Sequence, residues 1–494
     1  MSFSNSPTVT VNGCTIMGTS QPATRDYPKA LDVFYGIPFA TAKRFQPAVL
    51  TAPEPSRRID ASKPGTAQPC AFAPHAIAEN PLRLNVFRPA LRSATSSTSS
   101  PEGGDAKLLP VVVYVHGGGF NFGHALERDV GSFVSWAKRD VLAVSVSYRI
   151  GAMGFPTGEE GGASVVKEMN LGLRDQRVAV EWVREWIDRP PLTHPFPLPF
   201  KKAILESGSA TARSVLSPKH PRPASQWQDL KAFAWNKALD TLPVDDLIQA
   251  SVIVYADHAS AVTWPFQPVV DGPGGVIPDL PLNLWNDLVL SGRAKDISII
   301  TGFCSHEGTL FAPQSASTSS EFRSFFSTLI PSLSPSDLDS LELLYPDPLI
   351  DSASPYRQLP GIGGPQRRPY GAQFRRIHEA YAHYAYICPV LHTAHVLSRA
   401  GARVYLYEFA ALAAPFRAAS HGDQAPIVAH DMTTLRSAPG LTAIAKEMNT
   451  RWTSFVASPQ AISARQTTKN GLPSKVPLQT MDPPSRVQAQ AQTQ

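Results

Sequence analysis

Short runs of apolar, often β-branched residues recur along the chain and predict the strands of a buried sheet. Most of these runs are separated by tens of residues. The predicted strands are residues 82–89, 111–115, 141–148, 203–206, 297–302 and 403–409. Residues 9–18 predict a short hairpin at an edge of the fold, and the aromatic-rich residues 33–40 predict an ordered loop.

Between these runs lie segments whose apolar residues repeat with helical spacing. The clearest is 170–187, in which Trp182 and Val183 belong to the apolar stripe and Asn170 can cap the N-terminus. Further helices are predicted within residues 126–139, 370–391 and 441–456, and Pro389 is expected to interrupt the second of these. A helix-sized segment between two apolar strands is the βαβ pattern of a parallel sheet, so the predicted fold class is α/β.

Two polar segments fall outside this pattern. Residues 92–107 form a Ser/Thr/Gly-rich linker, and residues 458–494 form a polar tail that we expect to be disordered. Residues 9–457 are expected to form one domain. The sequence has no internal repeat and no uninterrupted apolar run of about 18 residues, so no transmembrane helix is expected.

The charge balance argues against a nucleic-acid partner. Among 494 residues, 45 are Lys or Arg and 40 are Asp or Glu, which gives a net charge of +5 without a basic cluster. The four cysteines match no zinc spacing and are too few for a disulfide framework. The first residues lack a basic region followed by an apolar run, so no signal peptide is evident and a cytoplasmic location is expected.

The stretch VVVYVHGGGF, residues 111–120, joins a predicted strand to candidate chemistry. His116 and three glycines follow the strand directly. Glycine has no Cβ, so a substrate oxygen can approach the backbone N–H groups as closely as an oxyanion requires. The alternative is an ordinary glycine-rich turn, and the motif alone does not separate the two.

Segments spread over residues 33–456 together resemble the type-B carboxylesterase/lipase family, which includes the cholinesterases. In chain order they are YGIPFA, RFQP, LRLNVFRP, HGGGF, SYRIGAMGF, NLGLRDQRVAVEWV, KKAILESGS, FQPVVDG, ITGFCSHEGTLF and EMNTRWTSF. The resemblance implies an α/β-hydrolase fold, with a mostly parallel central sheet flanked by helices. It also implies hydrolysis of a small-molecule carboxylic ester by Ser-His-Glu acyl transfer, without a metal or cofactor. It indicates no oligomeric state.

The resemblance assigns four site residues. Glu307, after the strand 297–302, occupies the family's acid position, and His421, after the strand 403–409, occupies the position of its base. Gly118 and Gly119 would donate two hydrogen bonds to the oxyanion. Taken without the resemblance, Glu307 is typical of a solvated turn, and His421 is one of 13 histidines, on a surface loop.

Several neighbouring residues are interpreted as structural. His306 is an alternative base, but a side chain adjacent to Glu307 would point away from it, so a simple loop residue is the better interpretation. Four aromatic residues could line a gorge for an apolar substrate group, although each taken singly is typical of a core. They are Phe120, Phe122, Trp264 and Phe303.

The family's nucleophile elbow, G-x-S-x-G, occurs nowhere in the sequence. In the family it lies between the helix 170–187 and the strand 203–206, where residues 188–200 supply only 13 residues, five of them proline. A strand, a helix and their connections need roughly 25 residues, and prolines exclude a central strand. Without this strand, the strands 141–148 and 203–206 must pair directly or leave unpaired edges. Ser207 and Ser209 lack the flanking glycines of an elbow, so neither is predicted to be the nucleophile.

Two explanations for the missing elbow are open. In the first, a gene-model error has removed it, and residues 190–200, whose codons are rich in C and T, are translated intron. In the second, the chain is a non-catalytic pseudoenzyme that acts as a binding or interaction module. The retained Glu307, His421 and HGGG motif favour the first explanation, because a protein that never forms an acyl-enzyme has no use for them.

Overall fold

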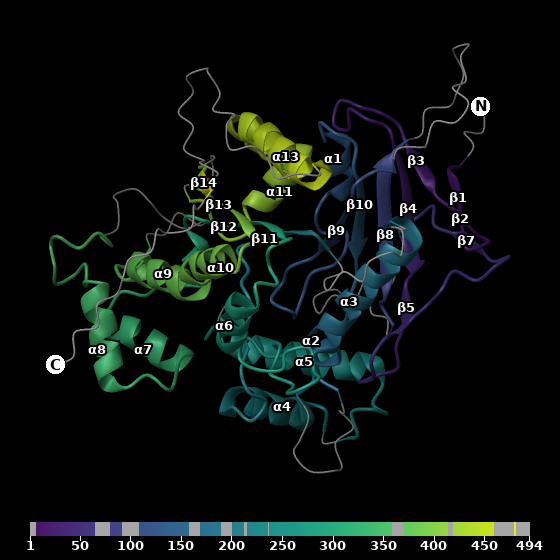
Figure 1. Ribbon diagram of the computed structural model, residues 1–494. Helices are drawn as coiled ribbons and strands as arrows, with labels where there is room; N and C mark the ends of the chain where they lie inside the picture. The colour runs from purple at the N-terminus through teal and green to yellow at the C-terminus, as the bar shows by residue number, and fades with distance from the viewer. Residues whose placement is uncertain are drawn as a thin grey trace.

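A computed structural model of the chain describes residues 6–64, 80–90, 108–157, 168–188, 200–211, 215–235, 237–357, 370–412, 418–458 and 479–480. Within these residues, helices lie on both faces of two mixed sheets, so the fold is α/β, as predicted (Figure 1). The predicted linker, most of the junction 188–200 and most of the tail 458–494 lie outside the described residues.

The first sheet collects strands from the N-terminal part of the chain. Its spatial order in the described residues is β3 (Thr19–Gln21), β4 (Leu31–Pro38), β8 (Arg83–Pro89), β10 (Leu142–Val146) and β9 (Val111–Val115). The pairings from β3 to β10 are antiparallel, whereas β10 and β9 run parallel. The prediction of a loop over residues 33–40 is wrong, because the mostly buried strand β4 pairs on both sides, with β3 and β8.

The second sheet positions the candidate site. Its order in the described residues is β11 (Lys202–Glu206), β12 (Ser298–Cys304), β13 (Arg403–Phe409) and β14 (Gln479–Thr480). The first three strands are parallel, so the C-terminal ends of β12 and β13 meet at one edge, with Cys304 opposite Phe409. The antiparallel strand β14 comes from the predicted tail.

Smaller β-structure lies outside these sheets. The described residues pair β1 (Thr8–Val11) with β2 (Cys14–Met17), β2 with β7 (Arg58–Asp60), and β5 (Ala40–Thr41) with β6 (Val49–Leu50). The antiparallel β1–β2 pair confirms the predicted hairpin over residues 9–18.

Helices cover both faces of the sheets. One face of both sheets shares a core with α1 (Val130–Ser135), α11 (Gln424–Ala429) and α13 (Thr442–Ala457). The opposite face packs on α3 (Leu171–Val183) under the first sheet, and on α6 (Pro281–Ser291) and α10 (Cys388–Arg399) under the second. This burial on both faces explains why the predicted strands read as apolar runs.

The remaining helices form two groups beside the sheets. In one group α4 (Pro221–Phe233) and α2 (Gly151–Gly154) pack on α5 (Val244–Ala259). In the other, α8 (Pro335–Leu344) and α9 (Phe374–Ala382) pack on α7 (Ser319–Leu329). The short helix α12 (Met432–Ser437) follows α11.

Two helix predictions require correction. Asn170 precedes α3, but its side chain caps nothing, because its Nδ2 donates to the Val269 carbonyl (2.7 Å) and its Oδ1 accepts from the Val269 amide (2.9 Å). The pair fastens the start of α3 to the segment 266–272. Pro389 does not end the helical run, and instead lies in the first turn of α10, directly after the hydrogen bonding changes from α-helical to π-helical. A wider π-helical turn, His383–Ile387, precedes it.

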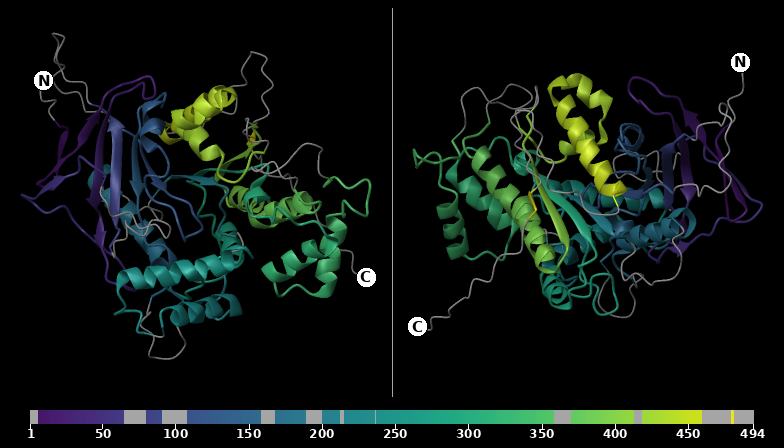
Figure 2. Two further views of the ribbon diagram at one scale, coloured as in Figure 1. Left: turned by 180° about the vertical axis from the view of Figure 1, so that it is seen from behind. Right: turned by 45° about the horizontal axis from the view of Figure 1, so that its top comes forward.

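The two sheets meet edge to edge: β9 is the edge strand of the first sheet, and it lies toward β11, the edge strand of the second (Figures 1 and 2). In the described part of the chain, β9 pairs only with β10, and β11 only with β12. The strands 141–148 and 203–206 therefore do not pair directly. The first of them, β10, has a partner on both sides, so the open edge belongs to β9.

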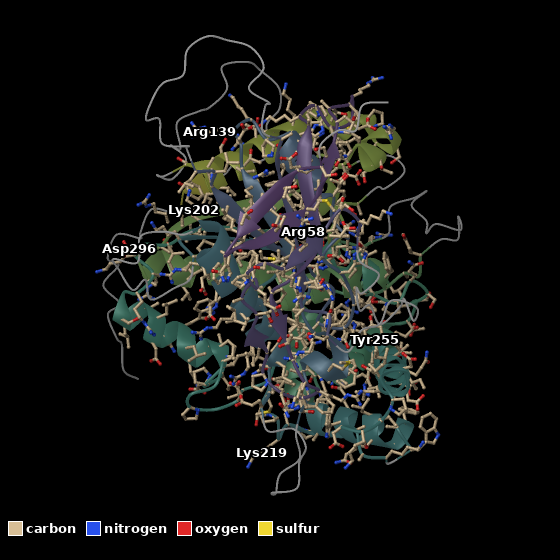
Figure 3. All side chains as sticks on the ribbon, turned by 90° about the vertical axis from the view of Figure 1, so that its right-hand side faces the viewer. Arg58, Arg139, Lys202, Lys219, Tyr255 and Asp296 are labelled. Atoms are coloured by element: carbon tan, nitrogen blue, oxygen red, sulfur yellow. The ribbon has the colours of Figure 1, made fainter. Side chains whose placement is uncertain are left out.

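An ion pair and α13 connect the two sheets where the edge strands β9 and β11 approach each other. Arg128, in the loop after β9, lies over the ring of Tyr114 on β9 (4.8 Å). Its Nη2 contacts Glu206 Oε2 on β11 at 2.5 Å, and the two side chains are only 15% and 14% exposed. Trp452 of α13 donates to the other oxygen of Glu206 (3.1 Å). Lys202 of β11, labelled in Figure 3, donates to backbone carbonyls at the end of α13.

We predict that Arg128→Met lowers the free energy of unfolding by about 3 kcal/mol, because it leaves the Glu206 carboxylate buried beside Trp452 without its cation. Urea unfolding followed by circular dichroism measures the loss. The matched control is Arg451→Met, which removes an exposed ion pair with Glu447 on α13 and should cost less than about 1 kcal/mol. Equal losses in the two variants would contradict a role for Arg128 in joining the sheets.

Candidate active site

Glu307 is a fully buried carboxylate at the start of a short 3-10 helix, Glu307–Leu310, that follows β12. Its Oε1 accepts hydrogen bonds from the Cys304 amide (2.7 Å) and the Ser207 hydroxyl (2.5 Å). Its Oε2 lies 2.5 Å from Nδ1 of His421. Three groups from three chain segments therefore satisfy the carboxylate, which is the condition for burying such a charge.

His421 lies in the loop after β13, and its side chain is 33% exposed. The carboxylate of Glu307 can only accept, so the bond between them places the imidazole proton on Nδ1. The lone pair is then on Nε2, which can take a proton from a reacting group. The rings of Tyr386 and Phe311 lie 4.5 and 5.5 Å from the imidazole and flank it.

The sheet order explains why Glu307 and His421 meet. β12 and β13 are neighbouring parallel strands, so the loops that follow them leave the same edge of the sheet. The His421 loop is further held by Asp423, which accepts from the Ser420 amide (2.7 Å). Burial raises the pKa of the Asp423 carboxyl above its ordinary value.

Gly118 and Gly119 both adopt positive φ, of 107° and 55°, in the turn after β9. A Cβ on Gly118 would lie 2.1 Å from the Phe122 carbonyl oxygen, and a Cβ on Gly119 would lie 2.3 Å from the Trp264 ring. Only glycine fits at either position. Within the described residues, no acceptor is found for the amide of either glycine, so both are available to an incoming oxygen.

Aromatic side chains connect this turn to His421. Trp264 lies against Gly119 and 5.6 Å from the ring of Phe311, which in turn lies 5.5 Å from the ring of His421. The Gln267 side chain also donates to the Gly119 carbonyl (2.8 Å). The glycine turn and the Glu307–His421 pair therefore border the same aromatic wall.

The interpretation of four aromatic residues as core fits two of them, because Phe120 and Trp264 pack against clusters of buried apolar side chains. Each side chain is half-buried rather than enclosed: Phe120, Phe122, Trp264 and Phe303. A small pocket lies between the segment 262–267 and α4, and its lining combines aromatic residues such as Trp227 with polar ones such as Arg222 and Gln226.

The two serines considered from the sequence have other partners. The Ser207 hydroxyl is buried and donates to Glu307, on the oxygen that does not contact His421. The Ser209 hydroxyl hydrogen bonds with the hydroxyls of Thr211 (3.0 Å) and Thr393 (2.7 Å). The structure thus pairs neither serine with His421.

The contact of Ser207 with Glu307 was not anticipated. Its signal in the sequence is positional: Ser207 follows β11, the strand beside β12, so both residues emerge at one edge of the sheet. Trp264 and Gln267 were likewise not expected to support Gly119, because they lie more than 140 residues from it in sequence.

The described residues contain no group of three or more His, Cys, Asp or Glu side chains arranged to hold a metal ion. Nor does any helix among them combine the length and apolar character needed to cross a membrane.

Comparison with known proteins identifies the family. The sequence profile of the carboxylesterase family matches residues 5–189 and 193–476. The chain belongs to the carboxylesterase family. Its fold is accordingly that of the α/β-hydrolases, as predicted. The two matched parts meet inside the junction 188–200, where the sequence lacks the elbow.

Named relatives include enzymes and a protein described as inactive. The chain is 28% identical to secreted lipase 4 of Gibberella zeae over 81% of its own length and 74% of the lipase. It is 27% identical to a secreted lipase of Arthroderma benhamiae over 64% of its length and 61% of that protein. It is 26% identical to the inactive carboxylesterase-like protein VdtD of Byssochlamys spectabilis, over 90% and 82% respectively.

These relatives overturn the expected cytoplasmic location, because two of them are named secreted lipases and point to an extracellular protein. That expectation rested on the absence of a recognisable signal peptide in the given sequence, which does not decide where the protein is located. A chain of this size buries enough apolar surface to fold without a disulfide framework, so few cysteines do not identify a reducing compartment.

A buried histidine, His378, lies on α9, which packs against the Glu307 loop. From its burial we predict that the free energy of unfolding decreases in acid. Its side chain is buried, no partner for Nδ1 is found among the described residues, and burial lowers its pKa from 6.5 to about 3. Between these values the unfolded chain binds a proton that the folded chain does not. The free energy of unfolding therefore falls as the pH falls through this window, by up to about 1.4 kcal/mol per pH unit.

Replacing the imidazole tests this linkage. In His378→Phe, the difference between the urea midpoints at pH 7 and pH 4.5 should shrink, because the titrating group is gone. His395→Gln, an exposed histidine on the neighbouring helix α10, serves as the control and should leave the difference unchanged. An undiminished difference in His378→Phe would show that other groups cause the acid sensitivity.

Proposed function

We propose that this fold is built to hydrolyse small carboxylic esters by acyl transfer, with Glu307 and His421 as the acid–base pair and Gly118 and Gly119 as oxyanion donors. The observation that carries the proposal is the hydrogen bond between His421 and the carboxylate of Glu307, which is buried and accepts three hydrogen bonds in all. Such a carboxylate orients the imidazole and stabilises the imidazolium that forms when the base takes a proton.

Each group has a defined task in the proposed reaction. Nε2 of His421 removes the proton from a serine hydroxyl as it attacks the ester carbonyl, and then returns it to the leaving alcohol. The amides of Gly118 and Gly119 stabilise the negative charge on the carbonyl oxygen. Water activated by His421 then releases the acid. The reaction needs no metal and no cofactor.

The serine itself is absent from this sequence, and we propose that a gene-model error has removed the segment that carries it. Two observations support this view. The edges of β9 and β11 lack the strand that would join them in the described residues, and the family match is interrupted between residues 189 and 193. One parallel strand and its helix, inserted in the junction 188–200, would supply the nucleophile. The same strand would form backbone hydrogen bonds with β9 on one side and β11 on the other.

Ester hydrolysis tests the proposed function directly. With p-nitrophenyl butyrate, the chain as written should show no turnover above background. A chain with an elbow segment restored at the junction should become active, and Glu307→Gln in that restored chain should then lower kcat by at least about 1000-fold. A restored chain that folds but does not hydrolyse the ester would contradict the proposal.

Transcript sequences test the proposed cause. Reads across the junction should contain an insert that encodes G-x-S-x-G in frame. Continuous reads that encode residues 188–200 without an insert would rule out a gene-model error.

The second candidate function is a non-catalytic binding or interaction module on the same fold. The observation in its favour is the relationship to VdtD, which is named an inactive carboxylesterase-like protein. Under this alternative, transcripts encode residues 188–200 without an insert. The chain then binds a small ester or acid without hydrolysing it.

A further inference from the structure

His306 ties the Glu307 loop to the His421 loop. Its backbone amide donates to the Ala419 carbonyl (2.9 Å), and its ring Nδ1 accepts from the Ala419 amide (3.2 Å). Its backbone also pairs with that of Ser420 as an isolated β-bridge. The ring, predicted to be an uninvolved loop side chain, in fact contacts the neighbouring loop.

The position of these contacts makes them relevant to the acid–base pair. His306 directly precedes Glu307, and Ala419 and Ser420 directly precede His421. Thr309 adds a link, because its hydroxyl donates to the His306 carbonyl (2.9 Å) and also lies 2.8 Å from the Ser420 hydroxyl, with which it forms a second hydrogen bond. The distance between Glu307 and His421 therefore depends on how these two short segments are held together.

The bond from the Ala419 amide sets the protonation state of His306. A ring nitrogen that accepts from an N–H group cannot carry a proton, so His306 is neutral, with its proton on Nε2. Protonation at Nδ1 would place two donors opposite each other and break the bond. His421 has the opposite arrangement, since its Nδ1 carries the proton toward Glu307.

Charged and titratable groups surround the His306 ring on two sides. From α9 it faces Arg375, Glu379 and the neutral His378, whose ring lies 6.3 Å away, and from β13 it faces Glu408. Burial is the largest influence and holds the pKa of His306 below its ordinary value of 6.5, while the two glutamates oppose the shift. The imidazole therefore stays neutral at pH 7.

We propose that His306 is a positioning residue, which in its neutral form holds the His421 loop in register with Glu307 and releases that loop when protonated. The catalytic meaning of this role rests on the proposed ester hydrolysis. The role itself does not, because the Glu307–His421 bond exists in the chain as written.

Proton NMR of the full chain reads the Glu307–His421 bond directly. The proton between the two residues should give a signal far downfield, identified by its loss in His421→Ala. His306→Phe, which cannot accept from the Ala419 amide, should lose or broaden this signal at pH 7. His306→Asn should keep it, because the amide oxygen can replace Nδ1 as the acceptor but does not titrate.

A matched control removes the same kind of bond elsewhere. His220 accepts from the Arg222 amide through Nδ1, also at 3.2 Å, at the start of α4. His220→Phe should leave the downfield signal unchanged. Hydrogen exchange measured by mass spectrometry supplies a second readout: the peptide containing Ala419 should exchange at least tenfold faster in His306→Phe than in His220→Phe.

The pH dependence decides the proposal even where His306→Phe does not fold. In the unmodified chain the signal should vanish in acid, at a pH under 6.5 because burial holds the pKa of His306 below that value, whereas in His306→Asn it should persist to lower pH. Loss of the signal at the same pH in both proteins, or an unchanged signal in folded His306→Phe, would overturn the proposal. A failure of the restored chain to hydrolyse esters would contradict the proposed function but leave these results unaffected.

Discussion

The buried carboxylate of Glu307 is the constraint on which the rest of this structure depends. A charge without access to water is tolerated only where hydrogen-bond donors surround it, and here the donors come from three separate chain segments. Ser207 follows β11, Cys304 ends β12, and His421 follows β13. The parallel order of these three strands is what brings the donors to a single point.

The same arrangement leaves the other half of the site to be positioned from a separate sheet. The glycine turn belongs to β9, whose far edge has no partner strand in the described residues. Side chains link it to the second sheet. Arg128 forms an ion pair with Glu206 between the two edge strands, and the ring of Trp264 contacts that of Phe311 beside the site. Ion pairs and ring contacts thus do what a continuous ladder of backbone hydrogen bonds does in an intact sheet.

The contrast between the retained and missing parts bears on function. An acid–base pair at hydrogen-bonding distance and a turn that only glycine can form are both costly to keep, since one buries a charge and the other fixes glycines, which lose the most conformational freedom on folding. The chain keeps both, although its sequence contains no G-x-S-x-G motif. Loss of function by gradual decay would have no reason to spare the surrounding geometry, which is why we favour an incomplete sequence over a binding module.

The sequence by itself determined the fold class, the strands of the central sheets and the approximate positions of Glu307, His421 and the glycine turn. The fold class and the strands follow from local signals, namely apolar runs and helical spacing, whereas Glu307 and His421 were identified through the resemblance to the family. It misjudged β4, because an aromatic-rich strand between two neighbours reads like an ordered loop, and it misjudged the capping role of Asn170, whose side chain is occupied by Val269.

Only the tertiary structure decided which side chains meet. Ser207 and Glu307 are 100 residues apart, and His306 and Ala419 are 113 apart, so no local pattern connects either pair. The tertiary structure also decided that β9, and not β10, carries the open edge of the first sheet. The order of strands in space depends on how separate segments pack their apolar faces, and that packing is not written in any one of them.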